Sequence, residues 1–329
     1  MSFHYYIYGL PVSSSRPISL LDEHAAMPGG TDVIWTTEST GIPQPDWLAA
    51  ASNESRPGKR LTFFSAETPE GTYHKLHFIT EHGTLQVVIS PAQARVWMIH
   101  DAAEPESNLD SYFVGTVLGC LLRLRGVVCL HASAVNIGGQ AVIFLGRKKS
   151  GKSTTAAAFA KLGYKVLSDD ISALHIKNDR FYIQPGYPKV RLRPKSLAVI
   201  HPGTAIEYVS VYSHRDSRYS DIGDSFWDTP LPLGAIYVMG ETVEVDGIPS
   251  IEDIAGERMI HLHANTFGSF VINSEGRKQE FALLSRLATA VPVRLLRFGR
   301  NVELVNLQCE AAIRDFAAIK KPIPLYKTN

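Results

Sequence analysis

Nine consecutive residues have the types and the spacing of a phosphate-binding loop. The first eight fit G-x-x-x-x-G-K-[ST], and the nine are Gly146, Arg147, Lys148, Lys149, Ser150, Gly151, Lys152, Ser153 and Thr154. The run 140–145 before them is typical of a strand, and the run 154–162 after them is typical of a helix. In this order, loop N–H groups and the helix N-terminus can surround phosphate oxygens. We therefore expect a nucleotide site, with Lys152 on the outer phosphates and the Ser153 hydroxyl on Mg²⁺.

The variable positions of this loop carry three consecutive cations, Arg147, Lys148 and Lys149. Such a run is consistent with a solvated loop face. It is equally consistent with a surface that raises the local concentration of an anionic nucleotide. We include all three among the expected nucleotide-binding residues.

Two adjacent carboxylates, Asp169 and Asp170, follow an apolar run at 164–168. Aspartates are common where strands end, but phosphoryl-transfer folds also place an acid beside the metal in this way. One acid can hold Mg²⁺ while the other accepts the proton of an attacking hydroxyl. We expect Asp170 to bind the metal with Ser153 and Asp169 to act as the base, although the two can exchange roles. Because the connection is short, we expect strands 140–145 and 164–168 to be neighbours.

Further cations could contact nucleotide or substrate. Lys189, Arg191 and Arg193 alternate, so on an extended segment they share one face. This face is either the wet side of a strand or a contact for phosphate or substrate. Arg258 is a further candidate for stabilising transferred charge.

The apolar run 127–135 is interrupted by His131. On composition alone this residue is a core histidine with its hydrogen bonds satisfied. The turn signal at 136–139, Asn-Ile-Gly-Gly, predicts that this strand pairs antiparallel with the strand entering the loop. A mixed sheet is therefore expected.

His131, the phosphate loop and the Asp169–Asp170 pair together resemble the core of the HPr kinase/phosphorylase family. The segments 185–194 and 230–237 resemble the HPr-kinase-like proteins found with ribosomal-peptide biosynthesis, notably the lasso-peptide precursor kinases. The resemblance covers roughly residues 127–325. It implies a fold related to phosphoenolpyruvate carboxykinase, with His131 near the transferred phosphate.

The chain departs from the bifunctional members of that family at one loop position. They carry an acidic residue directly after the loop serine, where this chain has Thr154. Their glycine- and asparagine-rich C-terminal signature is also missing. Both differences argue against HPr as the substrate and against phosphorolysis as a second activity.

The elements that must position these residues suggest an α/β protein in two parts. Residues 1–108 are expected to form a β-rich N-terminal domain, with strands at 5–10, 31–36, 61–65, 73–80, 84–89 and 94–100 and a loop or very short helix at 39–59. A linking helix is expected at 109–126. An HPr-kinase-like phosphate-loop domain, with a mixed sheet and flanking helices, then fills 127–329. The polar segment 208–227 is expected to be a loop or an exposed strand.

Composition excludes several classes of protein. The 329 residues are 45% hydrophobic and carry a formal net charge of +1, which does not favour nucleic acid or an acidic membrane surface as a partner. The three cysteines lie in apolar segments and are expected to be reduced core residues. With neither a signal peptide nor a membrane span evident, we expect a cytoplasmic protein. The oligomeric state stays open.

These expectations combine into an ATP- and Mg²⁺-dependent kinase. It would transfer the γ-phosphate to a side-chain hydroxyl, foremost serine, of a peptide or small protein. The resemblance points to a ribosomal precursor peptide, such as a lasso-peptide precursor. Two alternatives are a nucleotide-binding regulator or scaffold without phosphotransfer, and a kinase of a small metabolite.

Overall fold

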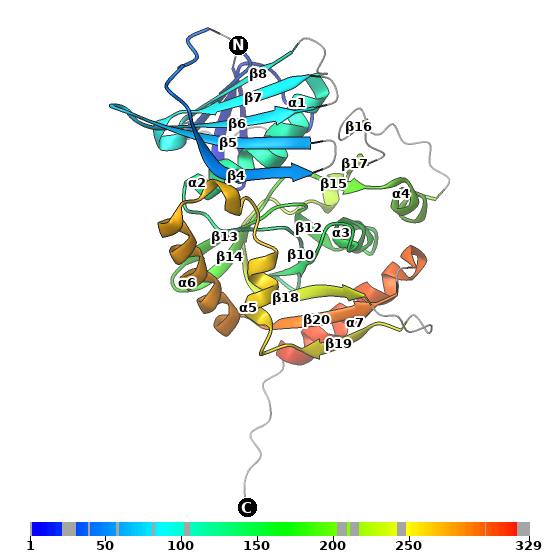
Figure 1. The fold of residues 1–329 in the computed structure, drawn as a ribbon. Helices are drawn as coiled ribbons and strands as arrows, with labels where there is room; N and C mark the ends of the chain where they lie inside the picture. Colours follow the sequence, from blue (N-terminus) through cyan, green and yellow to red (C-terminus); the bar gives the residue numbers. More distant parts are fainter. Residues whose placement is uncertain are drawn as a thin grey trace, which may run out of the picture.

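The structure is a computed structural model. It describes residues 2–21, 31–38, 40–56, 59–80, 83–101, 106–202, 209–210, 217–241, 248–299 and 301–320. Figure 1 shows an N-terminal sheet, coloured blue to cyan, above a second sheet with flanking helices. The expected α/β architecture with a β-rich first part is therefore confirmed. The exact domain boundaries remain predictions.

Among the described residues, eight strands form the N-terminal sheet, in the order β1-β2-β3-β8-β7-β6-β5-β4. Their bounds are β1 Phe3–Ile7, β2 Leu10–Ser14, β3 Val33–Thr36, β4 Leu48–Arg56, β5 Lys59–Thr68, β6 Gly71–Ile79, β7 Thr84–Ile89 and β8 Arg95–His100. Strands β4 to β8 pair antiparallel, whereas β3 is parallel to both of its neighbours. In β2, buried and half-buried residues alternate, as expected of a sheet that packs one face on a core.

Two predictions for this sheet are wrong. The run 5–10 is not one strand, because Tyr8 and Gly9 turn the chain between β1 and β2. The run 39–59 is not merely a loop, because it contains β4, which pairs with β5 at the sheet edge. Backbone pairing to β5 forms this strand although its sequence lacks a β pattern.

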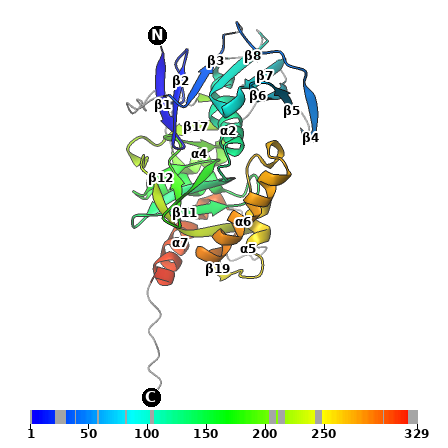
Figure 2. The ribbon, with the colours of Figure 1, turned by 90° about the vertical axis from the view of Figure 1, so that its left-hand side faces the viewer.

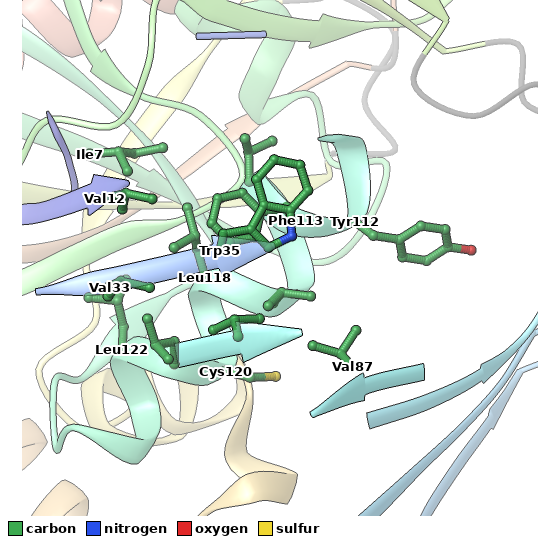
Figure 3. Close-up of a cluster of buried hydrophobic side chains, with 14 of the residues drawn as sticks. Ile7, Val12, Val33, Trp35, Val87, Tyr112, Phe113, Leu118, Cys120 and Leu122 are labelled. Carbon is green, nitrogen blue, oxygen red and sulfur yellow. The ribbon is translucent and has the colours of Figure 1, made fainter. Parts of the chain in front are cut away.

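The expected linking helix is present but irregular. It consists of α1 (Glu106–Tyr112), a π-helical turn η2 (Phe113–Val117) and α2 (Leu118–Leu124). Phe113 lies against Trp35 of the N-terminal sheet, as Figure 3 shows. Their rings are stacked with centroids 4.5 Å apart. The same buried cluster includes residues of the C-terminal part, namely Ile171, Ala173, Tyr187, Tyr219 and Val271. The two parts of the chain therefore share one core.

The second sheet has nine strands within the described residues, ordered β12-β10-β11-β18-β14-β13-β9, with β20 beside β18 and β19 beside β20. Their bounds are β9 Cys129–Leu130, β10 Ala132–Ile137, β11 Gln140–Leu145, β12 Lys165–Ser168, β13 Ser172–Lys177, β14 Arg180–Gln184, β18 Leu231–Glu241, β19 Ser250–Asp253 and β20 Val293–Phe298. β11 and β20 are parallel to β18, whereas β10 is antiparallel to β11. The expected mixed sheet is confirmed.

Strands β11 and β12 are not the neighbours that the sequence predicts. β10 lies between them and pairs antiparallel with both. The tight turn at Gly138 and Gly139 closes β10 onto β11, so β12 takes the free edge of β10. β11 and β12 nevertheless run in the same direction, and therefore the phosphate loop and the two acids emerge at the same end of the sheet.

Helices cover both faces of this sheet (Figure 2). One buried cluster contains residues of α3 (Lys152–Lys161), α4 (Pro194–Ile200) and α7 (Val305–Lys320). A separate cluster contains residues of α5 (Arg258–Ala264) and α6 (Ser274–Ala290). The buried stripe of α6 runs through Glu280, Leu284, Leu287 and Ala288, whereas Phe281 is 61% exposed.

A small third sheet joins β15 (Lys189–Leu192) to β17 (Arg218–Asp221) and β16 (Val209–Ser210). Segment 208–227 thus contains strands, but β17 is the central strand of this sheet and its Tyr219 and Ser220 are buried, so the expected exposed strand is not found there; residues 208 and 211–216 lie outside the described ranges. All three cysteines are buried and free, as expected. In the described ranges, no helix has the length and hydropathy that crossing a bilayer requires.

Candidate active site

The phosphate loop connects β11 to α3 in the order that the sequence predicts. Lys149 and Gly151 have φ angles of +73° and +96°, so the loop makes two left-handed steps before α3 begins at Lys152. A Cβ atom on Gly146 would lie 2.8 Å from the Ser150 Oγ, which explains the need for glycine there. Arg147, the first variable position, is exposed like Lys148 and Lys149 after it. The loop therefore offers a helix N-terminus with an exposed cationic rim.

Lys152 is buried and spans the loop from within. Its Nζ donates hydrogen bonds to the carbonyl oxygens of Gly146 at 2.7 Å and Arg147 at 3.1 Å. Burial lowers the pKa of Lys152, whereas the charges of Asp170 and Asp169 oppose that shift. The ammonium group is thus positioned between the loop backbone and the two acids.

The two residues that follow Lys152 point to different partners. Thr154 Oγ1 lies 2.8 Å from the Ser196 Oγ of α4. Ser153 is half-buried, and its hydroxyl favours the ionised form of Asp169, whose pKa it lowers. The loop serine therefore lies on the side of the acids, and Thr154 contributes to packing against α4.

Asp169 is the buried member of the acid pair, with 3% of its surface exposed. Its Oδ1 accepts a hydrogen bond from Ser133 Oγ at 2.5 Å, and its Oδ2 accepts one from the backbone N–H of Arg191 at 2.9 Å. Burial raises the pKa of Asp169, and these donors oppose the increase. Its geometry is fixed by short hydrogen bonds from two different strands, β10 and β15.

Asp170 is more accessible, with 29% of its side chain exposed. Its Oδ1 lies 3.3 Å from His131 Nδ1, and its Oδ2 lies 3.5 Å from Arg191 Nη1. Burial alone would raise the pKa of Asp170, but the charges of His131, Arg191, Lys152 and Lys148 outweigh burial and lower it. A φ angle of +67° places its backbone in the left-handed region, a strained conformation that concentrates at functional sites.

His131 lies at the break between β9 and β10. Its backbone N–H donates to the Asn265 carbonyl at 2.8 Å, and its ring is stacked near Phe267 with centroids 6.3 Å apart. Burial lowers the pKa of His131, and the nearby Asp170 only partly offsets that effect. The structure therefore brings His131 beside Asp170. Its position near the transferred phosphate, which the family resemblance implies, stays a prediction.

The four further cations fall into different places. Arg191 contacts both acids, as described above. Lys189 pairs with Asp221 at 2.9 Å, and Arg193 is an exposed residue that precedes α4. Arg258 binds Asp253 at 3.0 Å and the Ala288 carbonyl at 3.1 Å, so its described contacts lie around the start of β20. Of the four, the described contacts link Arg191 alone to the acid pair.

Sequence analysis missed Ser133, which is fully buried and donates the shortest hydrogen bond to Asp169. Its spacing could have identified it as a site residue. Ser133 follows His131 by two residues where a strand begins, so the two side chains are expected on the same side. A buried polar residue at that position needs a partner, which is the carboxylate.

The residues present fit a nucleotide with Mg²⁺. Ser150 Oγ is a buried atom without a hydrogen-bond partner in the described structure, inside a loop whose helix N-terminus carries no side-chain cap. Within the described ranges, no three His, Cys, Asp or Glu side chains gather into a metal site. Mg²⁺ commonly takes only one or two carboxylates and completes its shell with phosphate oxygens and water. Ser153 and one aspartate match that requirement.

Comparison with known proteins does not identify the function of the chain. No family model matches the chain, and no curated protein matches it. Among solved structures, the HPr(Ser) kinase/phosphatase from Coxiella burnetii is similar, with 14% sequence identity and a TM-score of 0.29 over 58% of this chain and 98% of that chain. A likeness this distant carries no argument about activity.

Proposed function

We propose that the chain is an ATP-dependent kinase that phosphorylates a serine hydroxyl on a peptide or small protein. The observation that carries the proposal is the meeting, at one end of the sheet, of Lys152 at a helix N-terminus with the carboxylates of Asp169 and Asp170. Phosphoryl transfer needs a cradle for the phosphates, charge neutralisation and a carboxylate near the nucleophile. A regulator that only binds nucleotide would not need the carboxylate near the nucleophile.

The surroundings of the acids favour the reverse of the roles first expected. Asp169 is buried next to the Ser153 hydroxyl, so we assign it to Mg²⁺ together with that serine. Asp170 is the more exposed carboxylate and is paired with His131, so we assign it as the general base. Bound Mg²⁺ would supply charge neutralisation on the phosphates.

In the proposed step, the acceptor hydroxyl attacks the γ-phosphorus of ATP. Its proton passes to Asp170, a new O–P bond forms, and the bond from the γ-phosphorus to the bridging oxygen breaks to release ADP. Lys152 and the loop N–H groups hold the outer phosphates, and Arg191 offsets the charge of the transferred group. His131 stabilises the transferred phosphoryl group.

A peptide acceptor is supported by the cations of β15, of which Arg191 contacts both acids. β15 places Lys189 and Arg191 on one face, where they can attract a carboxylate or a phosphorylated product. By resemblance, the acceptor would be a ribosomal precursor peptide, such as a lasso-peptide precursor.

Mass spectrometry after incubation with ATP and Mg²⁺ tests this function. The two acceptors are HPr and a precursor peptide encoded beside the gene. We expect a gain of one phosphate on the peptide, and no gain when its acceptor serine is replaced by alanine. Phosphorylation of HPr with the peptide untouched would contradict the acceptor, and ATP binding without transfer to either would favour a regulator or scaffold.

Two isosteric variants test the roles of the acids. Asp170→Asn should lower transfer by roughly 10²–10⁴-fold, the range for a lost general base, while ATP still binds. Asp169→Asn should raise the Mg²⁺ concentration needed for half-maximal transfer. Loss of transfer in Asp169→Asn with Asp170→Asn still active would restore the order first expected from the sequence.

A further inference from the structure

Tyr8 reaches the neighbourhood of the acids from the N-terminal sheet. It forms the two-residue turn between β1 and β2 with Gly9, and its φ angle of +53° is one that aromatic residues rarely adopt. Its backbone N–H donates to the Pro185 carbonyl at 2.9 Å. This strained turn is therefore attached directly to the segment that leads into β15.

The Tyr8 side chain is packed into the C-terminal part. A Cβ atom on Gly186 would lie 3.0 Å from a ring carbon of Tyr8 and 3.3 Å from its hydroxyl oxygen. Gly186 in turn donates its N–H to the Leu167 carbonyl at 2.7 Å, two residues before Asp169. The tyrosine tip thus lies against the backbone next to the end of β12.

The Tyr8 hydroxyl lacks a hydrogen-bond partner in the described part of the chain, although the residue is only 3% exposed. A buried hydroxyl without a partner destabilises a fold, and phenylalanine would fill the same space without that penalty. Burial, and then the charge of Asp170, raise the pKa of Tyr8 well above its ordinary value. The hydroxyl is therefore a permanent donor that lacks an acceptor.

Asp170 is the acid with capacity for another donor. Asp169 already accepts hydrogen bonds of 2.5 and 2.9 Å, whereas the contacts of Asp170 with His131 and Arg191 are 3.3 and 3.5 Å long. A carboxylate can accept about four hydrogen bonds. His131 and Arg191 are also the groups that would turn toward a bound triphosphate.

Tyr8 shares a buried cluster with Ile171, the residue after Asp170, whereas α3 behind the phosphate loop packs in a separate cluster. A donor from the Tyr8 cluster therefore belongs to a different packing unit from the helix that would hold the phosphates.

We propose that Tyr8 is a positioning residue for catalysis, whose hydroxyl donates a hydrogen bond to Asp170 when nucleotide draws His131 and Arg191 away. The inference rests on the proposed function, in which Asp170 is the base. It assigns the N-terminal sheet a part in the reaction, namely that of fixing the base from a second structural unit.

Tyr8→Phe tests this role in the full-length enzyme, with Tyr6→Phe, in the preceding strand β1, as the control. Turnover is measured with Mg-ATP and the precursor peptide, and in parallel as ATP hydrolysis with water as the acceptor. We expect kcat to fall about tenfold in Tyr8→Phe, the equivalent of one well-placed hydrogen bond. Peptide KM and ATP affinity should change less than twofold, and the melting temperature should not fall. Tyr6→Phe should match the wild type in every measurement.

A Tyr8→Phe enzyme with wild-type kcat in both assays would overturn the inference. A lowered melting temperature with a matching loss of ATP-binding sites would also overturn it, because the role would then be structural. Failure of the wild-type enzyme to phosphorylate the peptide would count against the proposed acceptor, while the hydrolysis assay would still compare the two tyrosine variants.

Discussion

Ser133→Ala is the most direct test of how the buried acid is held. The substitution removes the 2.5 Å hydrogen bond to Asp169 Oδ1 and leaves the 2.9 Å bond from the Arg191 backbone. Hydrogen bonds to charged groups contribute about 1.5–3 kcal/mol, so unfolding free energy at pH 8 should fall by about that amount. Urea unfolding of the protein without nucleotide and Mg²⁺ measures the loss.

The pH dependence of that loss identifies its cause. The Ser133 bond favours the ionised carboxylate and so lowers the pKa of Asp169, in opposition to burial. Its stabilising contribution is therefore complete while Asp169 is ionised, and it is lost as pH falls through the folded pKa. Because burial raises the pKa of Asp169, the loss should begin at a higher pH than for an ordinary aspartate. The difference between wild type and Ser133→Ala should accordingly shrink on acidification.

Ser172→Ala is the matched control, because it removes an equally buried serine with neutral partners. Ser172 Oγ lies 3.1 Å from Ser168 Oγ and donates to the Ala132 carbonyl at 3.3 Å. Its loss should lower stability by about 0.5–1.5 kcal/mol, with no dependence on pH. A Ser133→Ala penalty that stays constant from pH 8 to about pH 4, or a Ser172→Ala penalty that follows the same trend, would refute the reasoning.

Three further predictions concern nucleotide binding and packing. Lys152→Ala should weaken ATP binding, because it removes the main side-chain contact to the outer phosphates; unchanged affinity by calorimetry would contradict the loop assignment. Glu280→Ala should destabilise by about 3–5 kcal/mol, because it leaves Arg123 buried without its partner (both side chains are 2% exposed). The double variant Arg123→Met/Glu280→Leu should recover most of that loss in chemical denaturation. Gly119→Ala should destabilise by about 1–3 kcal/mol, because its Cβ would lie 2.2 Å from the Phe267 ring; a melting temperature equal to wild type would show that the ring can move aside.

Local sequence pattern was sufficient to predict most of the candidate site at the end of the second sheet. The loop needs glycine at its two fixed positions, and the acids need only an apolar strand before them, so both are visible without tertiary information. The meeting of His131 with Asp170 depended on the family resemblance. Ser133 was in principle detectable from its spacing to His131.

Other features depend on long-range pairing that no local pattern encodes. β10 separates β11 from β12 because a hairpin closes before the later strand arrives. β4 is a strand because β5 offers it an edge, and Phe281 is exposed because α5 and the sheet bury the other stripe of α6. The approach of Tyr8 requires a left-handed turn and contacts with residues almost 180 positions away.

The shared core in Figure 3 has a consequence for synthesis on the ribosome. Strands β1 to β3 share one buried cluster with residues as distant as Tyr219 and Val271. Long-range contacts of this kind form late, since loop closure must precede them. The apolar surface of the nascent N-terminal sheet therefore stays exposed until about four-fifths of the chain has emerged from the ribosome. Chaperone binding during translation should fall on this sheet, and a fragment that ends before Val271 should aggregate instead of accumulating as a folded N-terminal unit.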